Sequence, residues 1–247
     1  MVLAPWARPA QSGLNHVTRG GLVNERNSER SLALAGVVFV ALMLISAFLP
    51  GSPPKPDDPA AKIVKFVVDE NDQLRWAAFV GLLAAIVLFG FLGAVWRTMR
   101  RAEGGSPMLA VGAALGAGLA AALFTIGGVL MSVVAIVGPA HIGPSGTRFF
   151  YVLFNALGSG GAMALALFIG AFASVIIETG VLPKVMGWLG VLVALVLLAA
   201  GGGVASTRDV FFVLGFVGFA AGALWILVIS VLMFRAGART TESVSAA

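Results

Sequence analysis

The sequence predicts an all-α protein: a polytopic membrane helix bundle with six transmembrane helices and a short amphipathic helix in the first extracytoplasmic loop. Two observations support this prediction. The 247 residues are 59% hydrophobic and only 11% charged, with a mean hydropathy of +1.00, whereas a soluble domain of this size needs far more charge to cover its surface. The apolar residues also form six separate runs, each close to the roughly 20 helical residues that cross a hydrocarbon core.

The charged residues and the absence of cysteine exclude several kinds of partner and chemistry. A chain without cysteine has no disulfide, no thiolate metal site and no thiol nucleophile. The net charge is +5, but the basic residues lie at the ends of apolar runs and do not form a patch with interleaved aromatic residues. The expected partner is therefore the lipid bilayer and not nucleic acid.

The chain is divided into two tails and one transmembrane domain. Residues 1–30 are polar and lack apolar periodicity, which predicts a disordered cytoplasmic tail, not a signal peptide. The transmembrane domain is expected at residues 31–235, followed by a cytoplasmic C-terminal tail at 236–247. Its predicted spans are residues 31–49, 74–96, 108–138, 149–177, 185–203 and 210–234.

The distribution of basic residues predicts the orientation of the spans. Ten Lys and Arg residues lie on the side of the two termini and six on the other side, where acidic residues dilute them. Because cytoplasmic segments are enriched in Lys and Arg, both termini are expected in the cytoplasm. Tryptophans near the ends of the runs are expected to form an interfacial belt: Trp76, Trp96, Trp188 and Trp225.

Residues 51–73 form the longest connection between spans. Its prolines predict a stiff start, and Asp58 followed by Pro59 is typical of a helix N-cap and first turn. Ile63 and Val67 then follow at one-face spacing, which predicts an amphipathic helix at about 59–70. This helix either lies on the bilayer or covers the outer ends of the spans, or it is a docking face for a protein partner.

Small residues dominate the spans and predict close helix packing. Gly112, Gly116 and Gly118 lie in the third span, and small and polar residues line one face of the fourth from Asn155 to Ala173. That face either packs against neighbouring helices or lines a polar cavity. The ligand-cavity candidates are Asn155, Ser159, Thr125 and Ser132.

Glu178 and Lys184 interrupt the apolar sequence between the fourth and fifth spans. Gly180 can take the left-handed conformation that ends a helix, and Pro183 suits the first turn of the next. Lys184 is close enough in sequence to pair with Glu178 across this turn. We therefore interpret Glu178 as part of an interfacial turn, since a carboxylate at the interface, unlike one inside the membrane, needs no functional explanation.

The stretch "ETGVLPKVMGWLG" at residues 178–190 resembles one found in a large group of uncharacterised bacterial membrane proteins that share a domain of unknown function. In that group a helix ends in a "TG-LP" turn and the next helix opens with "GW-G". The resemblance implies six spans over residues 31–235 and a location in the bacterial plasma membrane. It implies no activity and no catalytic residues.

The remaining motifs do not support a catalytic site, a metal site or a cofactor. "LGSGG" at residues 157–161 lacks the first glycine of a rhomboid-type serine protease motif, and no histidine follows His141. His16 and His141 are isolated, whereas metal sites need clustered ligands. Two hypotheses remain: a membrane component without catalytic machinery that binds lipids or partners or supports a complex, and a transporter or facilitator of an uncharged small molecule or lipid through the Asn155 and Ser159 face.

Overall fold

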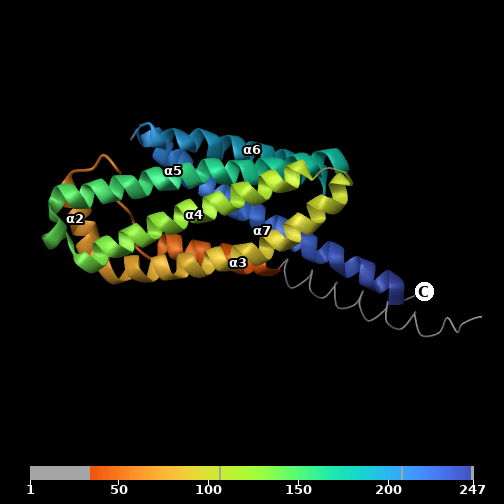
Figure 1. Ribbon diagram of the computed structural model, residues 1–247, viewed down its shortest axis with the longest axis horizontal. Helices are drawn as coiled ribbons and strands as arrows, with labels where there is room; N and C mark the ends of the chain where they lie inside the picture. The colour runs from red at the N-terminus through yellow and green to blue at the C-terminus, as the bar shows by residue number, and fades with distance from the viewer. Residues whose placement is uncertain (1–33, 106, 207, 246–247) are drawn as a thin grey trace, which may run out of the picture.

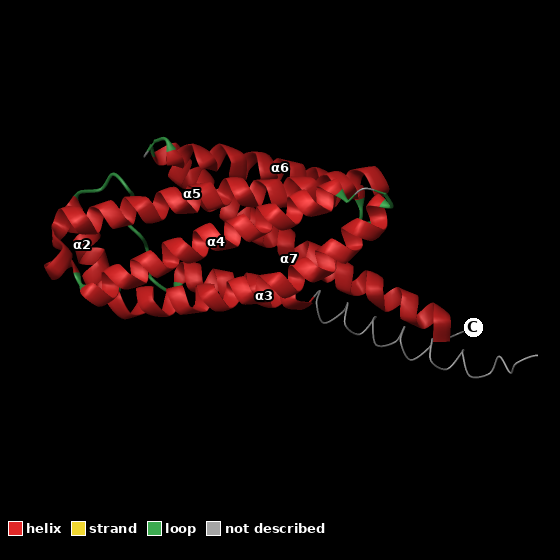
Figure 2. Cartoon of the chain, viewed as in Figure 1, coloured by secondary structure: helices red, strands yellow, loops and turns green. Residues whose placement is uncertain are grey.

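The computed structural model describes residues 34–105, 107–206 and 208–245, and every regular element in this part of the chain is a helix (Figure 2). The predicted tail at residues 1–30 lies outside the described residues. Five helices are long and apolar enough to cross a membrane, which identifies an integral membrane protein. They are α3 (Asn71–Glu103), α4 (Met108–Val137), α5 (Pro139–Thr179), α6 (Lys184–Ala200) extended by the short helix η1 (Gly201–Val204), and α7 (Asp209–Ser245).

The first described helix, Leu34–Phe48, is apolar but shorter than these five. Five of the six predicted spans thus have the length of a membrane crossing within the described residues. This helix lies between α3 and α7. The Ser46 hydroxyl donates a hydrogen bond to the carbonyl oxygen of Ala77 in α3 at 2.8 Å, and the ring of Phe48 meets the edge of Phe216 in α7 at a centroid distance of 6.2 Å. The first helix therefore packs against both α3 and α7.

Helix α5 is the central helix of the bundle. In its most apolar stretch 67% of the residues are buried, compared with 28% to 33% in the other four long helices. It packs against α4 on one side and α6 on the other (Figure 1). Gly143 interrupts its helical backbone with φ 79° and ψ 163°, directly before Pro144. The predicted span at 149–177 lies in the regular part that follows.

The two ends of the bundle carry different connections. Helix α2 (Ala60–Asp69) lies across one end, which also holds the α4–α5 connection and the start of α7 (Figure 1). The α3–α4 and α5–α6 turns and the C-terminus lie at the other end. The outward faces between these ends carry large exposed apolar side chains, as a lipid-facing surface requires: Ile86, Leu115, Leu192 and Leu224 are examples.

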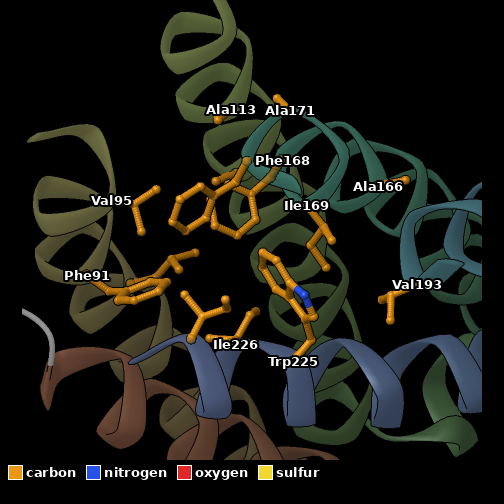
Figure 3. Close-up of a cluster of buried hydrophobic side chains, with 14 of the residues drawn as sticks. Phe91, Val95, Ala113, Ala166, Phe168, Ile169, Ala171, Val193, Trp225 and Ile226 are labelled. Atoms are coloured by element: carbon orange, nitrogen blue, oxygen red, sulfur yellow. The ribbon is translucent and has the colours of Figure 1, made fainter. Parts of the chain in front are cut away.

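The largest hydrophobic core lies where α3, α5 and α7 meet, and it includes Phe91, Phe168 and Ile226 (Figure 3). Trp225 also belongs to this core and is only 4% exposed. Its indole nitrogen donates a hydrogen bond to the carbonyl oxygen of Met186 at 2.9 Å. Trp225, one of the tryptophans expected near the interface, is thus buried and not lipid-facing: it joins α7 to the start of α6, where its N–H has a partner.

Among the third-span glycines Gly112, Gly116 and Gly118, only Gly116 shows the close helix packing that the sequence predicts. A Cβ atom on Gly116 would lie 2.8 Å from the Ala164 carbonyl oxygen and 2.8 Å from the Phe168 nitrogen, so α4 and α5 touch backbone to backbone there. Gly112 and Gly118 have nothing within 4 Å of the same position. Of these three glycines only Gly116 therefore makes a close contact, while Ala113 and Ala117 of the same four-residue repeat are buried.

Candidate functional site

The segment from the first helix to α2, residues 49–59, is named the strap. It begins with a turn in which Gly51 has a φ of 68°, a conformation that favours glycine. The hydroxyl of Tyr151 in α5 donates a hydrogen bond to the Pro54 carbonyl oxygen. The Lys55 ammonium lies 2.5 Å from a carboxylate oxygen of Asp209 at the start of α7. The strap is thus fixed to both α5 and α7.

Helix α2 covers the ends of α4 and α5, and together with the strap it forms what we name the cap. Ile63 and Val67 are each 0% exposed and pack in a second hydrophobic cluster with Met131, Val134 and Tyr151. The observed bounds, Ala60–Asp69, agree closely with the range read from one-face spacing. The apolar face of α2 is therefore occupied by the bundle, while its charged face points away from it.

Asp58 does not cap α2 as the sequence predicted. The residue directly before the helix is Pro59, and no side chain caps the helix start. The Asp58 carboxylate instead accepts hydrogen bonds from the Lys55 backbone N–H at 2.8 Å and pairs with the Lys62 ammonium at 2.7 Å. It lies one residue too early to reach the first free N–H groups of the helix, so it stabilises the strap.

The charged contacts of the strap shift the pKa values of two groups. The Lys62 ammonium, followed by the Lys55 N–H, holds the pKa of Asp58 below its ordinary value. The hydrogen bond to Asp209 raises the pKa of Lys55. The Asp58 contribution is therefore lost only as pH falls through its lowered pKa, and the Lys55 contribution only as pH rises through its raised pKa. Both contacts are formed around neutral pH.

A cavity of about 290 Å³, named the central cavity, lies beneath the cap. Pro53, Phe66 and Tyr151 line it at the cap, while Leu88 and Ile226 line it deeper in the bundle. The first helix, α3, α4, α5 and α7 all contribute to its wall, which is almost entirely apolar. Among the predicted cavity candidates only Thr125 lies on this wall, and no described group is hydrogen-bonded to its hydroxyl.

A second space of about 440 Å³, named the outer cavity, lies at the same end of the bundle between α5, η1 and the start of α7. Asn155 and Ser159 line it, as do Ser206, Arg208 and the rings of Phe211 and Phe212. The Asn155 side-chain nitrogen donates to the Tyr151 carbonyl oxygen at 2.9 Å. The Ser159 hydroxyl oxygen lies only 2.4 Å from where a Cβ on Gly203 would be, so a side chain at residue 203 would require that hydroxyl to rotate away.

The small-residue face of the fourth span therefore serves both of the alternatives that the sequence left open. Its outer part, at Asn155 and Ser159, lines a cavity. Its deeper part packs against α6, since Ala173 is 0% exposed and a Cβ on Gly190 would lie 2.9 Å from the Ala173 Cβ. Ser132 is half-buried and lines neither of the two cavities.

The α5–α6 turn has the backbone that its sequence predicts but not the ion pair. Gly180 ends α5 in the left-handed region with a φ of 66°, and Pro183 directly precedes α6. Glu178 and Lys184 are both exposed, and no ion pair within 4 Å joins these two described residues. Glu178 faces solvent beyond the apolar part of α5, so it lies far from both cavities along that helix.

No cluster of at least three His, Cys, Asp or Glu residues that could hold a metal ion occurs in the described part of the chain. His141 is exposed in the first turn of α5, and His16 lies outside the described residues. No family model, curated protein or solved structure matches the chain. The function is therefore argued from the two cavities and the cap alone.

The sequence analysis missed Tyr151 and Arg208 as site residues. Tyr151 is the only tyrosine of the chain and lies inside an apolar run. A buried tyrosine hydroxyl needs a hydrogen-bond partner, so its position was a usable signal. Arg208 was read only as a charge at the end of a span, and no sequence pattern shows that it lies beside Asn155.

Proposed function

We propose that this membrane protein binds a lipid or another apolar molecule in the central cavity, beneath the cap, and acts without catalytic groups of its own. The observation that supports this is the wall of the cavity. Five helices and the cap line a partly open space of about 290 Å³ with almost only apolar side chains, and Tyr151 is the sole titratable residue among those that line it. This volume is just below the range of about 300–1,000 Å³ for small-molecule sites.

We expect Ala121→Leu to reduce the amount of lipid that co-purifies with the protein several-fold. Ala121 lines the central cavity, so three added carbon atoms would occupy space that the ligand needs. Ala122→Leu is the matched control, because this neighbour in the same helix is exposed and lies outside the cavity wall. Lipid per mole of purified protein, measured by mass spectrometry after extraction, checks the expectation. Equal lipid content in the two variants would contradict the proposed function.

The outer cavity favours a second candidate, a transporter or facilitator of an uncharged small molecule or lipid. Its wall carries the Asn155 amide and the Ser159 hydroxyl, which can hydrogen-bond such a molecule during passage. Flux of a candidate molecule into liposomes that contain the purified protein separates the two functions, since binding alone produces no flux.

We also propose that the chain belongs to the group of bacterial six-span proteins with the "ETG-LP-GW-G" turn and lies in the plasma membrane with both termini in the cytoplasm. The strap, α2 and the start of α7 share one end of the bundle (Figure 1). The α3–α4 turn, the α5–α6 turn and the C-terminus share the other. The count of ten Lys and Arg residues on one side and six on the other assumes this same grouping of segments.

A reporter enzyme that works only outside the cytoplasm should be inactive when fused after Ala247 and active when inserted near Pro56 in the strap. The positive-inside rule gives this result, because the C-terminal end carries the larger share of Lys and Arg. Enzyme activity normalised to the amount of fusion protein is the measurement. An active C-terminal fusion would reverse the proposed orientation.

A further inference from the structure

We propose that the central and outer cavities bind the two ends of one molecule, a single-chain lipid with an acidic head group. The apolar chain would occupy the central cavity and the carboxylate or phosphate the outer cavity. This inference rests on the proposed lipid-binding function and adds the chemical class of the ligand.

Helix α5 and the strap contribute residues to both cavities, and we name this shared boundary the wall. On α5, Tyr151 and Phe154 line the central cavity, whereas Val152 and Asn155 line the outer one. On the strap, Pro53 lines the central cavity and Pro56 the outer one. The hydrogen bond from Tyr151 to Pro54 joins these two parts of the wall.

The two sides of this wall differ in chemistry. The central cavity is almost entirely apolar, while Arg208, Asn155, Ser159 and Ser206 are among the residues that line the outer cavity. Arg208 is the only charged side chain that lines either cavity in the described part of the chain. Nearby Lys55 is already paired with Asp209 at 2.5 Å. An anionic group that accepts hydrogen bonds suits this outer wall.

A ligand can replace the contact at the centre of the wall, the hydrogen bond from Tyr151 to Pro54. Tyr151 is 1% exposed, and its hydroxyl bonds to the strap, which contains no regular helix. A lipid that passes between α5 and the strap would displace the Pro54 carbonyl oxygen and offer its own head-group oxygen to the same hydroxyl. The Tyr151 hydroxyl would then donate its hydrogen bond to the ligand instead of to the strap.

Photo-crosslinking in nanodiscs tests this inference with two probes, analogues of dodecanoic acid and of dodecane that each carry a diazirine in mid-chain. Peptide mass spectrometry locates the labelled residues. The test variant is the double change Arg208→Gln and Ser159→Ala, which removes a charge and a hydroxyl without adding volume. Arg148→Gln is the matched control, since Arg148 is exposed on α5 and lines neither cavity.

We expect both probes to label residues of the central cavity, with the acid labelling several-fold more than the hydrocarbon. The double variant should reduce labelling by the acid to the level of the hydrocarbon and leave the hydrocarbon unchanged, while Arg148→Gln changes neither. If both probes label the cavity equally, or if the acid is insensitive to the double variant, one ligand does not span the wall and only the proposed function stands. If neither probe labels the central cavity, the proposed function itself fails.

Two further experiments test whether the anion belongs to the lipid and whether the ligand crosses the wall. Millimolar inorganic phosphate should not displace the acid, because the chain contributes to its binding. Full displacement by phosphate would assign the outer cavity to a free anion. Tyr151→Phe keeps the ring but frees the strap, and it should raise the rate of labelling by the acid. An unchanged rate would show that the ligand does not cross between Tyr151 and Pro54.

Discussion

Gly116→Val is expected to lower the stability of the folded bundle by about 1–3 kcal/mol, the usual cost of overpacking a well-packed core. A Cβ at this position would lie 2.8 Å from the Ala164 oxygen and 2.8 Å from the Phe168 nitrogen. Both are backbone atoms of the central helix, so no side chain can rotate away and α4 must separate from α5. The thermal midpoint in mild detergent, followed by circular dichroism or by the monodisperse fraction after heating, is the measurement.

Gly112→Val is the control for Gly116→Val, because it makes the same change one turn earlier in the same helix. Nothing lies within 4 Å of a Cβ at Gly112, so only the smaller effect of helix propensity should remain. If the two variants have the same thermal midpoint, the close approach of α4 and α5 does not contribute to stability.

Ile63→Asp is expected to detach the cap from the bundle. Ile63 is 0% exposed among apolar side chains of α4 and α5, and a buried charge without a partner costs about 3–5 kcal/mol. Since the spans keep their own core, the expected result is a folded bundle with an open cap. Hydrogen exchange of peptides from the strap and α2 should become several-fold faster, while peptides from α5 keep their protection.

Val68→Asp is the control for Ile63→Asp, because Val68 lies on the same helix but is 56% exposed. Equal exchange in both variants would mean that α2 is not held by its apolar face. Charge reversal at Asp69 and Glu70 addresses the docking hypothesis. Loss of a co-purifying protein in that variant, with the cap still protected, would show that the charged face of α2 binds a partner.

The sequence predicts the helices of this protein well because membrane insertion demands long apolar runs, and their ends are marked by charge, glycine or proline. Helix α2 follows from the spacing of Ile63 and Val67 alone, and the left-handed Gly180 from the residues around it. These features depend on a few neighbouring residues.

The cavities could not be predicted in the same way. Their walls depend on how each helix is rotated about its axis, and in an apolar chain almost every face is compatible with lipid or with the core. Trp225 illustrates this: its position near the end of a run suggested an interface, but the rotation of α7 turns it into the core. Asn155 and Ser159 were recognised as candidates, whereas Arg208 lines the same cavity because η1 and the start of α7 lie against α5.

The ion pair between Lys55 and Asp209 joins residues that are 154 positions apart in the chain. During synthesis the strap leaves the ribosome long before α7 does, so this tether can form only when the last helix has been inserted. Until then the cap rests on α3, α4 and α5. The order of biosynthesis therefore leaves the cap without its contact to α7 until the chain is nearly complete.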